Sequence, residues 1–235
     1  ATGLTEAQLA VITLNGSTPN INSSGQLSTS SVVISTFNNA GGDNLWSNAA
    51  NWTDGIPNVD TAKINIDADL IVDSNKTVAQ IKISGTGSAS SVTITATNSS
   101  VLTITGVGVT QPIQNNKSAS SLIFNLPVVF DSSEDKTETL RLNSGGDQNI
   151  TFSNSLTLND ALTVTGVNKN HDLNFNGSLL GSGNLILGAK TQANFGTDYD
   201  GSSFTGAINI AGGAASTNNQ VTVISNVSDD GTFLK

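Results

Sequence analysis

Trp46 and Trp52 are the only tryptophans in the chain, and they lie in one polar segment. An exposed indole face stacks on the C–H groups of a sugar ring, so the pair predicts carbohydrate binding. Tyr199, the single tyrosine, is a third candidate contact for a sugar. The alternative interpretation is that both tryptophans are buried and pack as a lid over the first turn of the fold.

Asp198 and Asp200 have one residue between them and lie just before Gly201. Such a pair of carboxylates predicts a Ca²⁺ site, although the third ligand and the distal Glu of an EF-type loop are missing. An ordinary surface turn is the alternative. A second acidic group, for which a solvated strand face is the alternative, consists of Asp67, Asp69 and Asp73.

Three pairs of threonines each place two hydroxyls on one face of a strand. If stacked on adjacent turns, they would form a flat array that orders water, as in ice-binding solenoids. The alternative is the ordinary preference of threonine for strands. The segments that contain the last two pairs repeat each other at an offset of 60 (161 − 101). The pairs are Thr93/Thr95, Thr103/Thr105 and Thr163/Thr165.

Groups for catalysis are few. Lyase chemistry on uronic acids needs a base and a cation that neutralises the carboxylate. Arg141 is the only arginine and has Lys136 nearby in the sequence, whereas His171, the only histidine, stands alone. Nucleophile-elbow, phosphate-loop and zinc-ligand spacings are missing. The sequence therefore predicts a protein that is not an enzyme, with a polysaccharide lyase or hydrolase as the catalytic alternative.

The charge balance excludes several partners. The chain has 18 acidic and 9 basic residues and a net charge of −9. Clustered Lys and Arg are needed to bind a phosphate backbone, so we expect no nucleic acid partner. The same repulsion disfavours acidic glycans unless calcium or a local lysine patch intervenes. No apolar run approaches the roughly 20 residues that span a bilayer, so membrane insertion is not expected.

The elements that position these residues are predicted to be short strands. Hydrophobic residues make up 36% of the chain and charged residues only 11%, so each strand has few large apolar side chains. From residue 76 onward, apolar and polar residues alternate in short runs separated by Gly, Asn, Ser or Asp. Stacked turns of a solenoid suit such a chain, because each turn shares its burial with its neighbours. The recurring strands argue against disorder of the whole chain.

Internal echoes favour a solenoid over a β-sandwich. Ile150–Leu156 resembles Leu173–Leu179 at an offset of 23 (173 − 150). Phe175 and Phe195 are related by an offset of 20 (195 − 175). Offsets in the low twenties match one turn of three short strands. We therefore predict an all-β fold, a right-handed parallel β-helix over residues 41–235.

Residues 1–40 differ from the rest of the chain in their sequence pattern. Thr5 and Gln8 have the spacing of a capping box, which predicts a short helix. A solenoid exposes an apolar rung at each end, and that rung has to be covered. We therefore predict that residues 1–40 form an N-terminal cap, with a flexible leader as the alternative.

Two stretches resemble the autotransporter-associated β-strand repeat proteins. They are Asn44–Trp52 with residues 55–57 and 60–62, and Gly181–Gly188 running on to Tyr199, Ser203–Gly206 and Ile208–Gly212. The resemblance implies a β-helix on a secreted or cell-surface bacterial protein, and it implies no shared catalytic residues. We expect the chain to be part of a longer multidomain protein, and its lack of Cys and Met suits an extracellular location.

The sequence thus predicts a non-catalytic carbohydrate-binding module of a secreted bacterial protein. Flat polar rungs, an Asn and Thr lattice and a few aromatics suit an extended polysaccharide lying on one face of the β-helix. No cofactor is expected apart from the calcium suggested by the acidic pair. The first alternative function is a structural segment of an adhesin or autotransporter-like passenger.

Overall fold

The computed structural model of the chain divides into two compact units, residues 1–33 and 34–235. The structure describes residues 20–21, 27–28, 33–66, 69–84, 91–107, 109, 111–115, 121–132, 138–142, 149–166, 171–188, 191–211 and 221–225. In the first unit, β1 (Asn20–Ile21) pairs antiparallel with β2 (Leu27–Ser28). The helix predicted after Thr5 lies outside the described residues.

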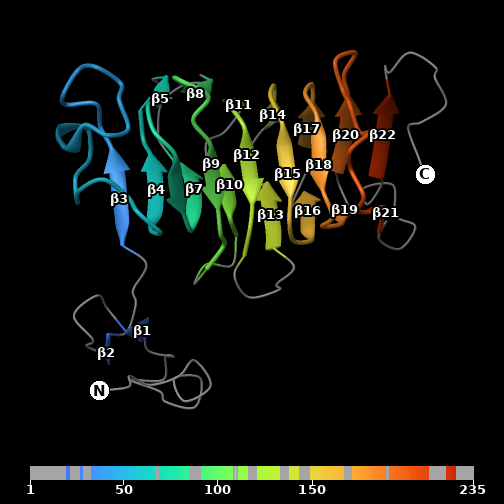
Figure 1. Ribbon diagram of the computed structural model, residues 1–235, viewed down its shortest axis with the longest axis horizontal. Helices are drawn as coiled ribbons and strands as arrows, with labels where there is room; N and C mark the ends of the chain where they lie inside the picture. The colour runs from blue at the N-terminus through green and yellow to red at the C-terminus, as the bar shows by residue number, and fades with distance from the viewer. Residues whose placement is uncertain are drawn as a thin grey trace. The chain divides into compact units, whose positions relative to one another are not determined.

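The second unit is a parallel β-solenoid with three sheets (Figure 1). The first sheet contains β3 (Ile34–Phe37), β4 (Thr61–Ile64), β7 (Gln80–Ile83), β10 (Ile113–Asn115), β13 (Glu138–Leu142), β16 (Leu162–Gly166), β19 (Leu185–Leu187) and β21 (Ile208–Ile210). The second sheet contains β5 (Leu70–Val72), β8 (Val92–Ala96), β11 (Ser121–Asn125), β14 (Asn149–Phe152), β17 (His171–Phe175), β20 (Thr191–Phe195) and β22 (Val221–Ser225). The third sheet contains β6 (Lys76–Val78), β9 (Leu102–Ile104), β12 (Val128–Phe130), β15 (Leu156–Leu158) and β18 (Leu179–Gly181).

From β4 to β20 the chain visits the three sheets in rotation, and one circuit makes one rung. Each strand pairs in parallel with the strand of its own sheet in the next rung, as β11 does with β14 and β14 with β17. The helical content of the described residues is one 3-10 turn, Ala49–Asn51. The prediction of an all-β fold with stacked parallel strands is confirmed.

The register of the strands tests the offsets of the internal sequence repeats. Ile150 pairs with Leu173, and Phe175 pairs with Phe195, so the predicted offsets of 23 (173 − 150) and 20 (195 − 175) are each one rung. Rungs differ in length, from a step of 19 in sequence number (80 − 61) to a step of 32 (113 − 81). Loops between strands absorb this variation, which explains why the repeat in the sequence is loose.

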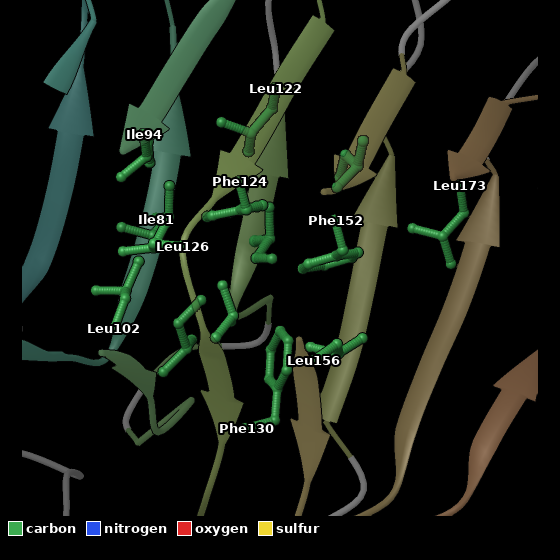
Figure 2. Close-up of a cluster of buried hydrophobic side chains, with 14 of the residues drawn as sticks. Ile81, Ile94, Leu102, Leu122, Phe124, Leu126, Phe130, Phe152, Leu156 and Leu173 are labelled. Atoms are coloured by element: carbon green, nitrogen blue, oxygen red, sulfur yellow. The ribbon is translucent and has the colours of Figure 1, made fainter. Parts of the chain in front are cut away.

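The core lies between the three sheets and is built from alternate residues of every strand. In β11, Leu122 and Phe124 are buried whereas Ile123 is only half-buried, as a strand with one inward face requires. Figure 2 shows Phe124 and Phe152 pointing into this interior from neighbouring strands. Burial of each such side chain contributes about 1.5–3 kcal/mol, so many small contributions over the rungs replace one large core.

Four phenylalanines form a ladder along the inner face of the second sheet. Their ring centroids lie 5.2, 6.0 and 5.0 Å apart in succession, and the planes of neighbouring rings differ by 15° or less. Because they occupy the same register position in successive rungs, they stack face to face. The residues are Phe124, Phe152, Phe175 and Phe195.

Candidate ligand-binding surface

Trp46 and Trp52 lie in the core at the first rung. Their side chains are 0% and 5% exposed, and their ring centroids are 5.0 Å apart. The Nε1–H of Trp52 donates to the carbonyl oxygen of Trp46 over 2.8 Å, and Phe37 meets the ring of Trp52 edge-on. Neither indole has a face open to a sugar. The sugar-stacking role predicted for the two tryptophans is therefore wrong, and their position agrees with the alternative of packing over the first turn.

Asp43 organises the loop that carries these tryptophans. Its carboxylate accepts hydrogen bonds from the side-chain amides of Asn51 and Asn48, each at 2.7 Å, and from the backbone N–H of Leu45 at 3.1 Å. These bonds, led by that of Asn51, lower the pKa of Asp43. The polar residues between the tryptophans thus fold their own loop, and the motif has a structural role.

Tyr199 lies at the end of the phenylalanine ladder. Its ring meets that of Phe195 edge-on at 4.8 Å with an interplanar angle of 74°, and it packs against the core as a half-buried residue. Burial and then the charge of Asp200 raise the pKa of the Tyr199 hydroxyl to about 12. The ring is thus engaged with the core beside Phe195, which limits the surface available for the predicted sugar contact.

Asp198 and Asp200 are both exposed. Asp200 accepts a hydrogen bond from the backbone N–H of Ser202 at 2.8 Å, and this bond lowers its pKa. The backbone carbonyl of Asp200 also accepts from the N–H of Leu179, which ties this turn to the third sheet. Calcium takes six to eight oxygen ligands. In the part of the chain that the structure describes, no group of three acidic, histidine or cysteine side chains is gathered, and the calcium site stays a prediction.

The two described members of the second acidic group lie at opposite ends of β5. Asp69 precedes β5 and is exposed, whereas Asp73 follows β5 and accepts hydrogen bonds from the backbone N–H and the hydroxyl of Ser47. These bonds lower the pKa of Asp73 despite an opposing contribution from burial. Asp67 lies outside the described residues. Asp73 therefore has a structural role that joins the first loop to the second sheet.

The threonine array predicted from the sequence is wrong. Thr93 and Thr95 lie in the second sheet, Thr103 in the third and Thr163 in the first, so the three pairs face different directions. The offset of 60 (161 − 101) fails for the same reason. Leu102 starts a strand of the third sheet, and two rungs later its partner in register is Leu156, at an offset of 54 (156 − 102).

The residues considered for catalysis lie on different sheets. Arg141 is in β13 of the first sheet and His171 is in β17 of the second. In register, Arg141 pairs with Gln114 and Thr165, and His171 pairs with Thr191. Lys136 lies outside the described residues. The fold does not bring the best cation and the single histidine into one column.

Sequence reasoning missed a row of polar side chains on the outer face of the second sheet. We define the amide column as Thr151, Asn174 and Asn194, which are partners in register in successive rungs. The side-chain amide of Asn194 donates to the Oδ1 of Asn174 over 2.7 Å, and that of Asn174 donates to the hydroxyl of Thr151 over 3.2 Å. The column is half-buried, so its amides are held in place yet reach the surface.

A second polar row runs parallel to the amide column. Ser121, Asn149, Asp172 and Gln192 are successive partners in register and lie two positions before those of the first row. The side-chain amide of Gln192 donates to the Oδ1 of Asn194 over 3.3 Å, which links the two rows. Together they present amide donors and acceptors at the spacing of neighbouring strands, about 4.8 Å. Aligning Phe152, Phe175 and Phe195 in the sequence would have revealed the amide column, because each member precedes one of these phenylalanines.

Comparison of the chain with protein-family models, with curated proteins and with solved structures finds no match. Among the described residues, no helix has the length and apolar character needed to cross a membrane.

Proposed function

We propose that this chain is a non-catalytic carbohydrate-binding module, and that an extended neutral polysaccharide lies along the outer face of the second sheet. The amide column carries the proposal. Its side chains are fixed by hydrogen bonds across rungs, so little rotamer entropy is lost when a ligand is bound. Amides both donate and accept hydrogen bonds, as the hydroxyl groups of a sugar require.

The geometry of the solenoid supports a long ligand. The two polar rows continue over β14, β17 and β20, so the same donors and acceptors recur at each rung. A polysaccharide with a repeating unit would make several equivalent contacts on such a face. Because these contacts belong to one polysaccharide molecule, each raises the effective concentration for the next and the overall affinity increases. The buried tryptophans take no part in this proposal.

The finer features of the fold belong to the same proposal. A strand, its crossover and the next parallel strand of one sheet are right-handed in about 98% of cases, so we infer a right-handed solenoid. The solenoid begins before the predicted boundary at residue 41, because β3 pairs with β4, and a capping role is proposed only for the residues that precede β3. The resemblance to autotransporter-associated repeats supports a secreted or cell-surface location in a bacterium and a place in a longer chain.

A structural segment of an adhesin or passenger is the second candidate. The burial of both tryptophans and the packing of Tyr199 against Phe195 favour it, because these aromatics serve the core. This candidate predicts no retention of the chain by any polysaccharide. A lyase or hydrolase would instead release new reducing ends or unsaturated products.

Affinity electrophoresis through gels that contain neutral bacterial, algal or plant polysaccharides tests the proposal. We expect one of them to retard the native chain without release of product, and EDTA to show whether calcium contributes. Asn174→Ala/Asn194→Ala is expected to lower the association constant about thirtyfold, since each of the two lost hydrogen bonds is worth about 1 kcal/mol. Thr103→Ala/Thr157→Ala, on the outer face of the third sheet, is the matched control and is expected to bind as the native chain does.

Equal retardation of the amide-column variant and the native chain would contradict the proposed face. Absence of retardation in every gel would favour the structural segment. Release of unsaturated or reducing products would favour the enzyme.

A further inference from the structure

Three basic residues share one line of register positions in the first sheet, away from the amide column. Lys63 pairs in register with Lys82, which in turn pairs with Gln114, and Gln114 pairs with Arg141. Thr36 and Thr165 extend the column by one rung at either end. We define these six positions as the basic column. Three of the nine basic residues of an acidic chain therefore fall on one line.

The spacing of this column is set by the sheet. Lys63 and Lys82 are direct partners in neighbouring strands, so their backbones are about 4.8 Å apart. Arg141 is two rungs beyond Lys82, at a register position about twice that distance away. The side chains of Lys63 and Lys82 are half-buried along their length, as expected for lysines that lie on a sheet with their ammonium groups in water.

The two lysines face each other without a partner of opposite charge. Within the described part of the chain, neither Lys63 nor Lys82 takes part in an ion pair. Like charges directly opposite each other on a sheet are destabilising. The positions two residues before and after them in the chain are Thr61, Asn65, Gln80 and Ser84, all neutral. These four flanking positions thus carry no acidic residue, and an anion placed beside the two lysines would relieve the repulsion.

The chemistry of the basic column favours one class of ligand. Two cations in neighbouring strands, with a third at a register position two rungs away, suit a linear polymer with one carboxylate or sulfate per repeat. A nucleic acid would need more cations along its backbone and, if single-stranded, aromatic faces for its bases. The column offers two lysines and one arginine with threonine and glutamine, and no aromatic residue. An acidic polysaccharide is therefore the occupant that the column fits.

We propose that the basic column binds an acidic polysaccharide, with the carboxylates of successive repeats paired with Lys63 and Lys82. This site is independent of the one on the second sheet, because the two lie on different faces. The long-range field of a chain with net charge −9 opposes the encounter, so the local column has to overcome it. Binding is therefore expected to be modest in strength and to weaken as salt screens the lysines.

Affinity electrophoresis through gels containing polygalacturonate, in EDTA and at increasing NaCl, measures this binding. We expect Lys63→Gln and Lys82→Gln each to lower the association constant about twofold to fivefold, the range of an exposed ion pair. Lys76→Gln changes the net charge equally, but Lys76 lies in β6 of the third sheet near Asp73, so it is the control. Lys63→Arg/Lys82→Arg keeps the charges and is expected to retain binding, and far-UV circular dichroism checks that each variant folds.

Several results would overturn the proposal. If polygalacturonate does not retard the native chain, the basic column is not a binding site. The same conclusion follows if Lys76→Gln lowers the association constant as much as the substitutions of Lys63 and Lys82 do. Tighter binding of single-stranded poly(dT) in a mobility shift would reassign it to nucleic acid. The two proposals separate because Asn174→Ala/Asn194→Ala is expected to leave polygalacturonate binding unchanged, and the lysine variants to leave binding of a neutral polysaccharide unchanged.

Discussion

At the scale of single residues, glycines fix how closely one rung approaches the next. Gly183 lies directly over Asp160, and a Cβ atom added to it would overlap the carbonyl oxygen of Asp160. Gly181 lies in the same way over Leu158 and also has a φ of 96°, which favours glycine. These two glycines belong to the segment that resembles a repeat unit, and the close approach is a physical reason for their presence.

Gly183→Ala is expected to lower the free energy of unfolding by about 1–3 kcal/mol, because the obstructing atoms belong to the backbone and cannot turn away. Urea unfolding followed by circular dichroism measures the change. Ser182→Ala at the neighbouring exposed position is the control and is expected to have an effect below about 0.5 kcal/mol. A Gly183→Ala variant as stable as the native chain would contradict the close stacking of these rungs.

Tyr199 offers a clean spectroscopic test, since it is the only tyrosine. Its absorbance change at alkaline pH is expected to have a midpoint near pH 12 in the folded chain, against the ordinary value of 10.0 in urea. The neutral phenol is favoured by folding, so its contribution to stability is present below pH 10 and is lost as the pH rises towards 12. A midpoint at the ordinary value in the folded chain would show that the ring is exposed and available to a sugar.

The two tryptophans differ in their hydrogen bonding. The Nε1–H of Trp52 donates to the carbonyl oxygen of Trp46, whereas the buried Nε1 of Trp46 has no partner among the described residues. Trp52→Phe is therefore expected to destabilise the chain by about 1 kcal/mol more than Trp46→Phe, because it leaves a buried carbonyl unpaired. Urea unfolding of both variants measures this difference. Equal losses would argue against the hydrogen bond, and a loss of polysaccharide binding in both folded variants would restore the tryptophans as contacts.

At the scale of elements, the inner face of a strand contributes to the core and its outer face to the proposed binding surface. In β14, Phe152 belongs to the phenylalanine ladder of the core and Thr151 to the amide column. A change at Phe152 is therefore expected to affect stability, and a change at Thr151 to affect binding. Phe152→Ala is expected to lower the free energy of unfolding by about 3–5 kcal/mol through the cavity it leaves. Thr151→Ala, measured by the same urea titration, is expected to cost about 1 kcal/mol or less. Similar losses for the two would contradict the assignment of the faces.

The sequence predicted this alternation and some of the register. Phe175 and Phe195 could be aligned because they lie in adjacent rungs joined by short loops and because both residues fill the same inner slot. The alignment of Leu102 with the segment at Leu162 failed, since strands of all three sheets share one pattern of small apolar and threonine residues. The alternation of apolar residues and threonines predicts which residues point inward, but it does not predict which of the three sheets a strand belongs to.

The sites were predicted less well than the strands. Trp46 and Trp52 stand among polar residues, which suggested exposure, but Asp43 and the neighbouring asparagines satisfy one another and leave the indoles in the core. The two correct alignments, at offsets of 23 (173 − 150) and 20 (195 − 175), already place the residues of the amide column together, but nothing in the sequence shows that their side chains bond to one another. The basic column needs the register of the first sheet, where loops of unequal length hide the relation between Lys63, Lys82 and Arg141.

At the scale of the whole molecule, the solenoid explains how a chain with 36% hydrophobic residues has a continuous core. Each rung buries a few side chains against the rungs on either side, and stability is the sum of these nearest-neighbour contacts. The same repetition turns single polar residues into rows on the outside. In this account the second sheet holds a neutral polysaccharide along the amide column, and the first sheet holds an acidic one.

Nuclear magnetic resonance of the side-chain amides tests whether a neutral polysaccharide binds at the amide column. An oligosaccharide derived from a retained neutral polysaccharide is added to isotopically labelled chain, and the NH₂ resonances of the asparagines are followed. We expect the resonances of Asn174 and Asn194 to shift in a saturable way. The amide of Asn159 donates to Asp131 outside the second sheet, and its resonance is expected to stay unchanged. Saturable shifts at Asn159 or at the tryptophan indoles, with Asn174 and Asn194 unchanged, would contradict binding at the amide column.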